Sequence, residues 1–395
     1  MKLKNHIHIA LGYFIVAAFL GVLLRSFYSF EIPINYKFIV HGHSHIALLG
    51  WVYMALTTLL YTLFLAHKDL VLKYRRIFWF TQITLMGMLV TFPFQGYALF
   101  SIIFSTLFLF ASYWFFWFFR KYARPEIKKS GSYQCINAAL WYMVISSLGP
   151  WVLGAVMKTL GAESIWYRLA IYFYLHFQYN GWMILALLGL LLYVFERQGI
   201  ATPKRMFQRF FLSMNGGIIL TYSLSTLWLR PSAIFYLLGG IGALLQLLAL
   251  IVLIRFIKDH LNDSGFTGFQ LKILKIGASL LFLKMGLQIV SSVPYFANLA
   301  STILDFAIGY LHLTFLGVVT LGLFLFLDFF GLLKIPKTSL RLYVIGFVFT
   351  EGLIFYKGIA AWLHFGIFKG YFEGLALGSF LILISLVTMF RRQRG

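Results

Sequence analysis

Residues 43–51 read His-Ser-His-Ile-Ala-Leu-Leu-Gly-Trp, and this stretch decides the fold because the chain carries it three times in altered form. Residues 176–182 read His-Phe-Gln-Tyr-Asn-Gly-Trp, and residues 312–318 read His-Leu-Thr-Phe-Leu-Gly-Val. In each copy a histidine is followed five positions later by glycine and then by a large apolar residue. The repeated histidine of the first copy is His45, and the three are separated by 131 and 136 residues. This period predicts an internal repeat.

The composition places the repeat in a membrane. Of the 395 residues, 61% are hydrophobic and 11% are charged, and the mean hydropathy is +0.86. A soluble domain has about 25% charged residues, so a soluble globular enzyme is excluded. The high apolar content also excludes a disordered chain. We therefore expect an all-α integral membrane protein with many spans.

Twelve apolar segments are long enough to cross a bilayer, which takes about 20 helical residues. They lie at 8–28, 38–66, 77–95, 97–119, 134–157, 167–195, 208–229, 232–257, 270–292, 299–329, 339–363 and 370–390. A very tight turn at 93–96 joins the third and fourth. Because four spans separate successive repeat histidines, we expect one membrane domain over 1–395. Within it, three pseudo-symmetric four-helix arcs would cover about 1–130, 131–265 and 266–395.

The basic residues give a predicted orientation. The net charge is +22, and 25 of the 33 lysines and arginines fall on one side of the twelve-span arrangement. The other eight are Arg25, Lys37, Lys158, Arg168, Arg230, Lys284, Lys357 and Lys369. The positive-inside rule then places both termini in the cytoplasm, and we expect the inner membrane of a bacterium. This bias explains the charge without nucleic acid as a partner. The first span lacks a clear cleavage site, so we expect no cleaved signal peptide.

The repeat histidines are candidate ligands. The second, sixth and tenth spans run from outside to inside, so His45, His176 and His312 fall in the outer half of the membrane. A single histidine there can simply bond a neighbouring helix. Three at one depth favour ligation by at least two, because neutral imidazole is a common ligand of haem and copper. The glycines five positions on would let a helix or a flat macrocycle approach.

This pattern resembles the catalytic subunit (subunit I) of the haem–copper oxidase superfamily, which includes oxygen-reducing oxidases and nitric oxide reductases. Residues 43–51 also look like the matching helix of NnrS-like membrane haem proteins, which are linked to nitric oxide tolerance. The resemblance implies haem b held by His45 and His312. It also implies that His176 is a copper ligand, with Tyr179 loosely matching the tyrosine of that site.

The chain departs from that superfamily at two places. The seventh span has no histidine where the superfamily has two copper ligands, and Tyr310 stands where a second haem would have its histidine. These departures argue against a proton-pumping terminal oxidase and favour a single haem. His176 would then either bind a second metal, copper or iron, or lie as a polar group beside a bound diatomic molecule.

Other residues complete the expected site. Trp51 belongs to the cofactor-binding set, and the cations Arg25, Arg168 and Lys369 are candidate partners of haem propionates. As single residues, these cations are more simply explained as snorkelling side chains.

Charged and polar residues inside the spans form a second group. Lys284, Asp305, Glu351 and Lys357 are functional candidates. We favour structural pairing, for example Lys284 with Glu351, over a proton route. The polar residues 178–180 would line a cavity near the haem.

These features lead to an expected function and two rivals. We expect a haem protein that carries out one-electron redox chemistry or binds nitric oxide or oxygen, which leaves a haem-dependent oxidoreductase open. The electron donor, quinol or cytochrome c, is not indicated, because the chain has one cysteine and no Cys-x-x-Cys-His. One rival is a cofactor-free proton-coupled transporter. The other is an assembly or sensor protein that holds haem without turnover.

Overall fold

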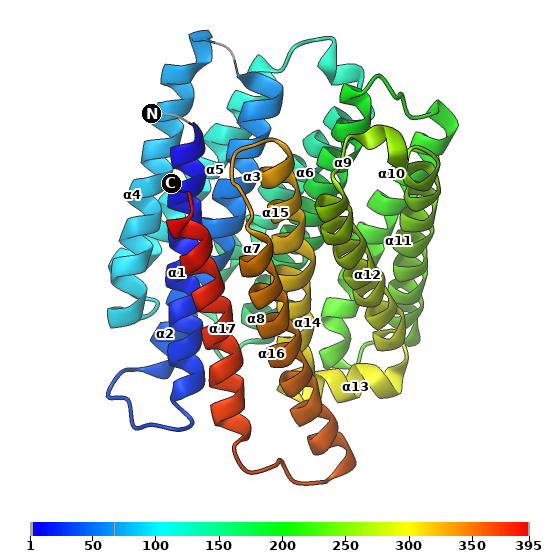
Figure 1. Ribbon diagram of the computed structural model, residues 1–395. Coiled ribbons are helices and arrows are strands. Elements are labelled where there is room, and N and C mark those ends of the chain that lie inside the picture. Colours follow the sequence, from blue (N-terminus) through cyan, green and yellow to red (C-terminus); the bar gives the residue numbers. More distant parts are fainter. Residues whose placement is uncertain (1–2, 67, 394–395) are drawn as a thin grey trace. The chain divides into compact units, whose positions relative to one another are not determined.

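The computed structural model describes residues 3–66 and 68–393, and within these residues the chain is helical and has no strand (Figure 1). Twelve helices are long and apolar enough to cross a membrane, which confirms the predicted number of spans. Large apolar side chains face outward, for example Phe94 at 80% and Leu212 at 70% exposure. Such surfaces are compatible with lipid and not with water. The chain is therefore a multi-pass membrane protein.

The helices form two compact units, residues 1–124 with 323–395 and residues 125–322. We call them unit 1 and unit 2. The predictions of a single domain and of three four-helix arcs stay predictions.

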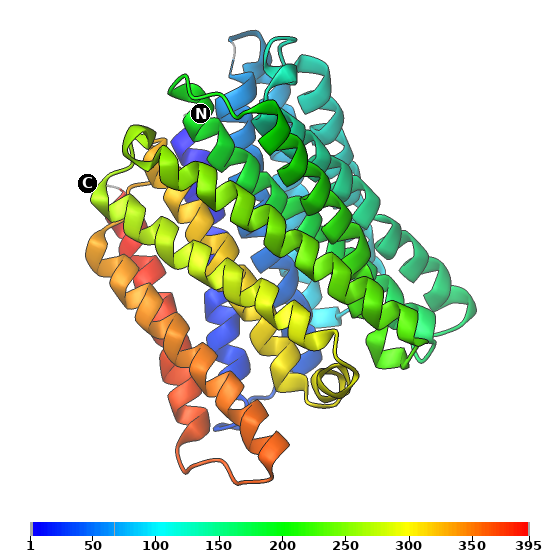
Figure 2. The ribbon, with the colours of Figure 1, turned by 90° about the vertical axis from the view of Figure 1, so that its right-hand side faces the viewer.

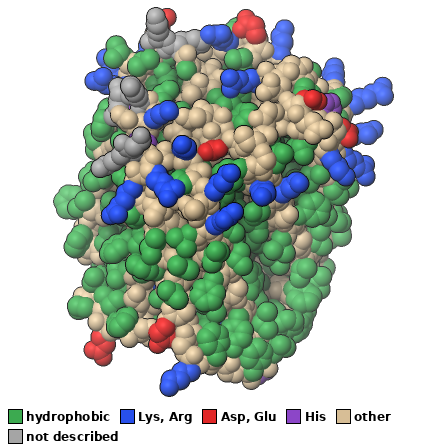
Figure 3. Space-filling view, viewed as in Figure 1, with side chains coloured by type: hydrophobic (Ala, Val, Ile, Leu, Met, Phe, Trp, Pro, Cys, Tyr) green, Lys and Arg blue, Asp and Glu red, His purple; other side chains and the backbone are tan. Residues whose placement is uncertain are grey.

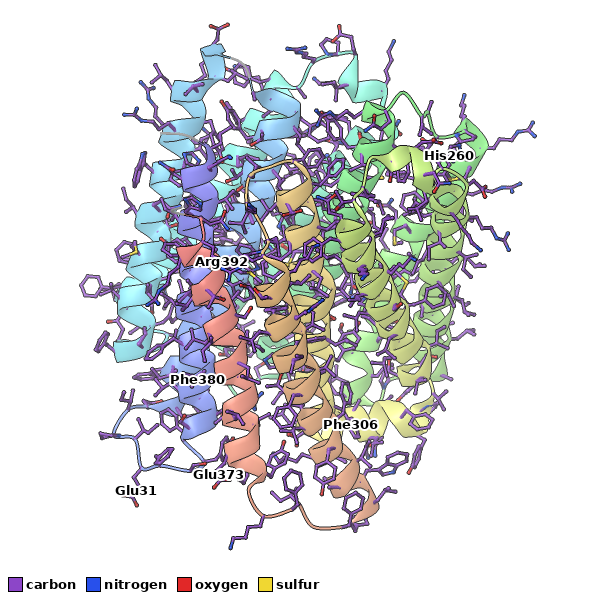
Figure 4. The ribbon with its side chains drawn as sticks, in the orientation of Figure 1. Glu31, His260, Phe306, Glu373, Phe380 and Arg392 are labelled. Atoms are coloured by element: carbon purple, nitrogen blue, oxygen red, sulfur yellow. The ribbon has the colours of Figure 1, made fainter. Side chains whose placement is uncertain are left out.

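Unit 1 consists mainly of paired antiparallel helices. Its elements are α1 (Leu3–Ser26), α2 (Tyr36–His45), η1 (Ile46–Tyr53), α3 (Met54–Leu60), η2 (Tyr61–Leu65), η3 (Lys68–Leu70), α4 (Val71–Gln95), α5 (Leu99–Tyr122), α16 (Lys337–Leu363) and α17 (Tyr371–Arg391). Helix α17 packs against both α1 and α16. Glu31 and Glu373 lie at one end of this unit and Arg392 lies toward the other (Figure 4). Over α16 and α17, hydrophobic side chains cover the middle of the face in Figure 3.

Unit 2 is likewise made of long helices. Its elements are η4 (Ile127–Lys129), α6 (Gly131–Ser146), α7 (Leu148–Thr159), α8 (Ile165–His176), η5 (Phe177–Ile184), α9 (Leu185–Arg197), α10 (Lys204–Leu220), η6 (Thr221–Leu229), α11 (Ala233–Asp259), η7 (Leu261–Ser264), α12 (Gly268–Ser291), α13 (Pro294–Thr302), α14 (Leu304–His312) and η8 (Leu313–Val319). Helix α15 (Thr320–Phe329) continues the tenth span into unit 1. Figure 2 shows α10, α11 and α12 alongside one another, with α13 lying crosswise at their end.

The boundaries confirm one prediction and correct another. The turn is tight as expected, because Gly96 takes a positive φ of 60° and Ser101 Oγ donates to its carbonyl at 2.6 Å. It lies at 96–98 and not at 93–96, since Pro93 and Gln95 are still part of α4. The tenth span begins at Leu304 and not at 299. The reason is that Pro294 starts the separate helix α13, which ends where Ile303 takes an extended conformation.

The three repeat helices share a feature that the sequence did not predict. The α-helix ends at His45, His176 and His312, and a π-helix starts at the next residue in each case, forming η1, η5 and η8. The first helix of each predicted arc packs against the matching π-helix, α1 on η1, α6 on η5 and α12 on η8. π-Helical turns are rare and occur frequently at functional sites. The repeat is thus visible in backbone geometry as well as in sequence.

The histidine-bearing spans are also the most enclosed in each unit. The span Tyr36–Leu65 of unit 1 is 83% buried, and the span Ile165–Arg197 of unit 2 is 94% buried. The span Leu304–Phe329, which begins in unit 2 and ends in unit 1, is 67% buried. The other nine spans of the described residues are at most 44% buried. The histidines therefore lie on the helices most shielded from lipid.

Candidate functional site

His45 has one ring nitrogen fixed by the backbone and the other facing a tyrosine. Its Nδ1 lies 2.8 Å from the carbonyl oxygen of His41, which can only accept, so Nδ1 carries the proton. Nε2 then carries the lone pair, and it lies 3.3 Å from the hydroxyl of Tyr97. The ring of Phe92 stacks on the imidazole at 4.3 Å between centroids. Fixing Nδ1 in this way is how proteins orient a histidine whose Nε2 binds a metal.

The two neighbouring histidines have different roles. His43 donates from Nδ1 to the carbonyl of Ala17 at 2.8 Å, so it ties α2 to α1 and points away from His45. The ring of His41 lies edge-on to Tyr97 at 4.6 Å. Phe92 and Tyr97 were not predicted from the sequence, and they come from the end of α4 and the following turn. Only the tight turn at Gly96 could have indicated that these residues return to the histidines.

His312 repeats the arrangement of His45 at Nδ1. This nitrogen lies 2.9 Å from the carbonyl oxygen of Ile308, four residues earlier. As in His45, Nδ1 therefore carries the proton and Nε2 carries the lone pair. The side chain is half-buried, as is that of His45. His45 belongs to unit 1 and His312 to unit 2. Their joint ligation of one haem stays a prediction.

His176 differs from His45, because its lone pair lies on Nδ1 and not on Nε2. Nε2 donates to the carbonyl of Ile218 at 2.8 Å, and Nδ1 accepts from Nδ2 of Asn180 at 3.2 Å. The residue is 1% exposed. In this arrangement Nε2 of His176 has no lone pair available to a metal. The hydrogen bonds therefore count against the predicted second-metal ligand and catalytic role.

Asn180 connects His176 to a fully buried lysine. The ammonium of Lys284, which is 0% exposed, donates to Oδ1 of Asn180 and, at 3.2 Å, to Oε1 of Gln288. The ring centroids of Tyr179 and Tyr310 lie 5.9 and 5.8 Å from Nζ of Lys284. Two amide oxygens and two aromatic rings thus stabilise the buried amine.

One expectation about these polar residues stays a prediction and one needs correction. Residues 178–180 are buried, with Gln178 donating to Ser146 Oγ at 3.0 Å, and a cavity lined by them stays a prediction. The pairing of Lys284 with Glu351 is not found. The lysine is satisfied by neutral amides, whereas both carboxyl oxygens of Glu351 have no hydrogen-bond partner among the described residues.

The repeat glycines allow close helix approach. A Cβ built at Gly50 would lie 2.8 Å from the Cβ of Tyr13, and one at Gly181 would lie 2.6 Å from the Cβ of Tyr142. Both distances are well inside van der Waals contact. In these two repeats a tyrosine of the preceding helix occupies the space that was predicted for either a helix or a macrocycle.

The remaining predicted residues belong to different elements of the two units. Trp51 is 1% exposed and stacks on Phe14 at 4.9 Å between centroids. Arg168 donates twice to the hydroxyl of Tyr172, at 3.0 and 2.8 Å, and its guanidinium lies 4.3 Å from the ring of Trp228. Arg25 is in the last turn of α1. Lys369 lies in the exposed loop between α16 and α17.

A protein-only metal cluster is not seen in residues 3–66 and 68–393, since no three His, Cys, Asp or Glu side chains converge there. A haem needs fewer protein ligands than such a cluster, because one or two axial ligands are enough to hold its iron. The tautomers of His45 and His312 are suited to axial ligation through Nε2, and that of His176 is not. No protein-family model matches the chain, and a search of curated proteins finds no match either.

Proposed function

We propose that this chain is a membrane haem protein in which His45 and His312 are axial ligands of haem b. The observation that carries the proposal is the geometry they share. Each histidine ends an α-helix, donates from Nδ1 to the carbonyl four residues earlier, and is followed at once by a π-helix. Two enclosed spans thus present imidazoles in the tautomer that a haem iron binds. A haem–copper oxidase-like arrangement of the twelve spans is part of this proposal.

The proposed chemistry uses one haem without a second metal. Bound haem would supply one-electron redox chemistry or bind a diatomic gas, nitric oxide or oxygen, and the electron donor would come from outside the chain. The protein's own residues hold and orient the ligands. The His41 carbonyl fixes the His45 ring, Phe92 covers one face of it, and the Tyr97 hydroxyl lies at the nitrogen that would bind iron.

The experiment compares three single substitutions in full-length protein produced with an adequate haem supply. His45→Ala and His312→Ala should each abolish the Soret band and sharp reduced α-band of a bis-histidine haem. His260→Ala is the matched control, because His260 makes the same Nδ1 bond to the carbonyl four residues earlier, at 2.9 Å to Phe256, but precedes no π-helix. It should leave the spectrum unchanged. A colourless, iron-free wild-type protein would refute the proposal, as would unchanged spectra in both ligand variants.

A second candidate function has its own supporting observation. The chain of hydrogen bonds from Lys284 through Asn180 to His176 links α12, η5 and α10 within unit 2, and it suits a cofactor-free proton-coupled transporter. Proteoliposomes with a pH-sensitive dye inside distinguish this candidate. Proton movement by haem-free protein, lost in Lys284→Met, would favour it over the haem proposal.

A further inference from the structure

Glu351 is a buried acid that the proposed haem site does not use. It lies near the middle of α16, within the span Lys337–Leu363, and is 7% exposed. Neither carboxyl oxygen is accessible to solvent or has a hydrogen-bond partner among the described residues. Buried carboxylates in proteins are normally paired or bonded. The described part of unit 1 therefore supplies no hydrogen-bond donor to the carboxyl group of Glu351.

The nearby donors of unit 1 are already engaged. The hydroxyl of Thr350 donates to the carbonyl of Gly346 at 2.9 Å, within its own helix. On α17, the hydroxyl of Tyr371 donates to the carbonyl of Leu353 at 3.1 Å, and Glu373 lies in the first turn. On α1, Arg25 is the charged group whose electrostatic field reaches Glu351, without a hydrogen bond to it. No described group of α1, α16 or α17 thus solvates a carboxylate at this position.

The neutral acid is the form that fits this environment. An ionised carboxylate without donors in an apolar interior is strongly disfavoured, and the group takes up a proton instead. We propose that Glu351 is a membrane-embedded proton-binding site, which holds a proton at rest and exchanges it when water or a donor reaches the carboxyl. The inference is independent of haem, since it rests only on contacts within unit 1.

A protonated carboxyl in an apolar place has a distinctive reactivity. It transfers its proton to a nitrogen of dicyclohexylcarbodiimide while a carboxyl oxygen bonds to the central carbon. The acyl group then shifts from oxygen to nitrogen to give a stable N-acylurea, and no group leaves. The test treats full-length protein in membrane vesicles with this reagent and maps the adduct by mass spectrometry of peptides. A water-soluble carbodiimide serves as the polar comparison. It should label Glu373, which is exposed in the first turn of α17, and it should not label Glu351.

The matched control is Glu196, a carboxylate that is well supplied with donors. It accepts from the backbone N–H of Ser132 at 3.0 Å and from the hydroxyl of the same residue. Labelling of Glu351 by the apolar reagent should exceed that of Glu196 by at least about tenfold, because two hydrogen bonds stabilise the carboxylate of Glu196 and none stabilises that of Glu351. It should decrease as the pH rises, and Glu351→Gln should lose it.

Three outcomes would overturn the inference. The first is a wild-type Glu351 peptide without adduct under conditions in which other carboxyls react. The second is labelling of Glu351 that does not change with pH. The third is suppression of labelling by sodium at constant pH, which would make the ligand a metal cation. Because the first two are read from wild-type protein, the result does not depend on the folding of the glutamine variant.

Discussion

His45 and His176 occupy the same place in two copies of one motif, yet their lone pairs lie on different nitrogens, on Nε2 beside the Tyr97 hydroxyl in His45 and on Nδ1 beside the Asn180 amide in His176. Both are followed by a π-helix, and both have a glycine five positions on that packs against a tyrosine of the preceding helix. The copies differ at the residues between histidine and glycine. Residues 47–49 are Ala-Leu-Leu, whereas residues 178–180 are Gln-Tyr-Asn. The backbone scaffold is shared, and a few side chains decide whether the imidazole can bind a ligand or serves the structure.

The largest effect is expected from making the second copy resemble the first. Asn180→Leu introduces the residue found at Leu49 and removes the partner of both Lys284 and His176. It should lower the free energy of unfolding by about 3 kcal/mol, because a hydrogen bond to a charged group is lost and the buried ammonium of Lys284 is left with Gln288 as its hydrogen-bond acceptor among the described residues. Reversible unfolding in mixed detergent micelles measures the change.

The double variant Asn180→Leu with Lys284→Met is the control. Removing both polar partners leaves an apolar contact of similar volume, so much of the lost stability should return. A double variant as unstable as the sum of the two single variants would show that the two side chains do not act together.

A smaller effect is expected where the copies agree. Gly50→Ala and Gly181→Ala should each cost about 2 kcal/mol, because the added methyl group overlaps Tyr13 or Tyr142. Gly12→Ala in α1 and Gly154→Ala in α7 are controls, since a Cβ at either position meets nothing within 4 Å. These controls should be neutral or stabilise the protein by up to about 1 kcal/mol. Equal effects at all four glycines would exclude close packing as the reason for the motif.

The third change separates stability from cofactor binding. His176→Leu should cost about 1 kcal/mol, the scale of interhelical hydrogen bonds in membranes, because Asn180 and Ile218 lose a partner. It should leave the absorption spectrum of bound haem unchanged, whereas His45→Ala removes it. Loss of the spectrum in His176→Leu would restore His176 as a ligand.

The smallest effect is expected at the hydroxyl beside His45. Tyr97→Phe removes the group that lies 3.3 Å from Nε2 and keeps the ring that contacts His41. The free energy of unfolding should change by less than about 1 kcal/mol, because the bond is long and neutral. Haem titration should show affinity equal to or greater than that of the wild type, since Nε2 loses a competing partner. A large loss of affinity would instead make the hydroxyl part of the haem site.

The spans and the repeat could be predicted from the sequence, because both depend on local hydrophobicity and spacing. The tight turn at Gly96 followed from its residue types in the same way. The π-helices could not, since propensities do not distinguish a π-turn from an α-turn in an apolar run. The hydrogen bonds that hold His176 also could not be predicted from the sequence, because they depend on residues of other helices. Ile218 accepts from His176 itself, and Lys284 donates to its partner Asn180. The amide at Asn180, one turn after His176, was the available signal and was assigned to a cavity.

The enclosure of the histidine-bearing spans has a consequence for how lipid acts on the protein. The spans Tyr36–Leu65 and Ile165–Arg197 have 30 and 33 residues, whereas the flanking helix Tyr371–Arg391 has 21. A bilayer core of about 30 Å is matched by roughly 20 helical residues, so the long spans exceed it. The less buried helices of each unit meet the lipid directly, so hydrophobic mismatch acts on them first. Variation in acyl-chain length should therefore tilt α17, which is 33% buried, more than the span Tyr36–Leu65, which is 83% buried.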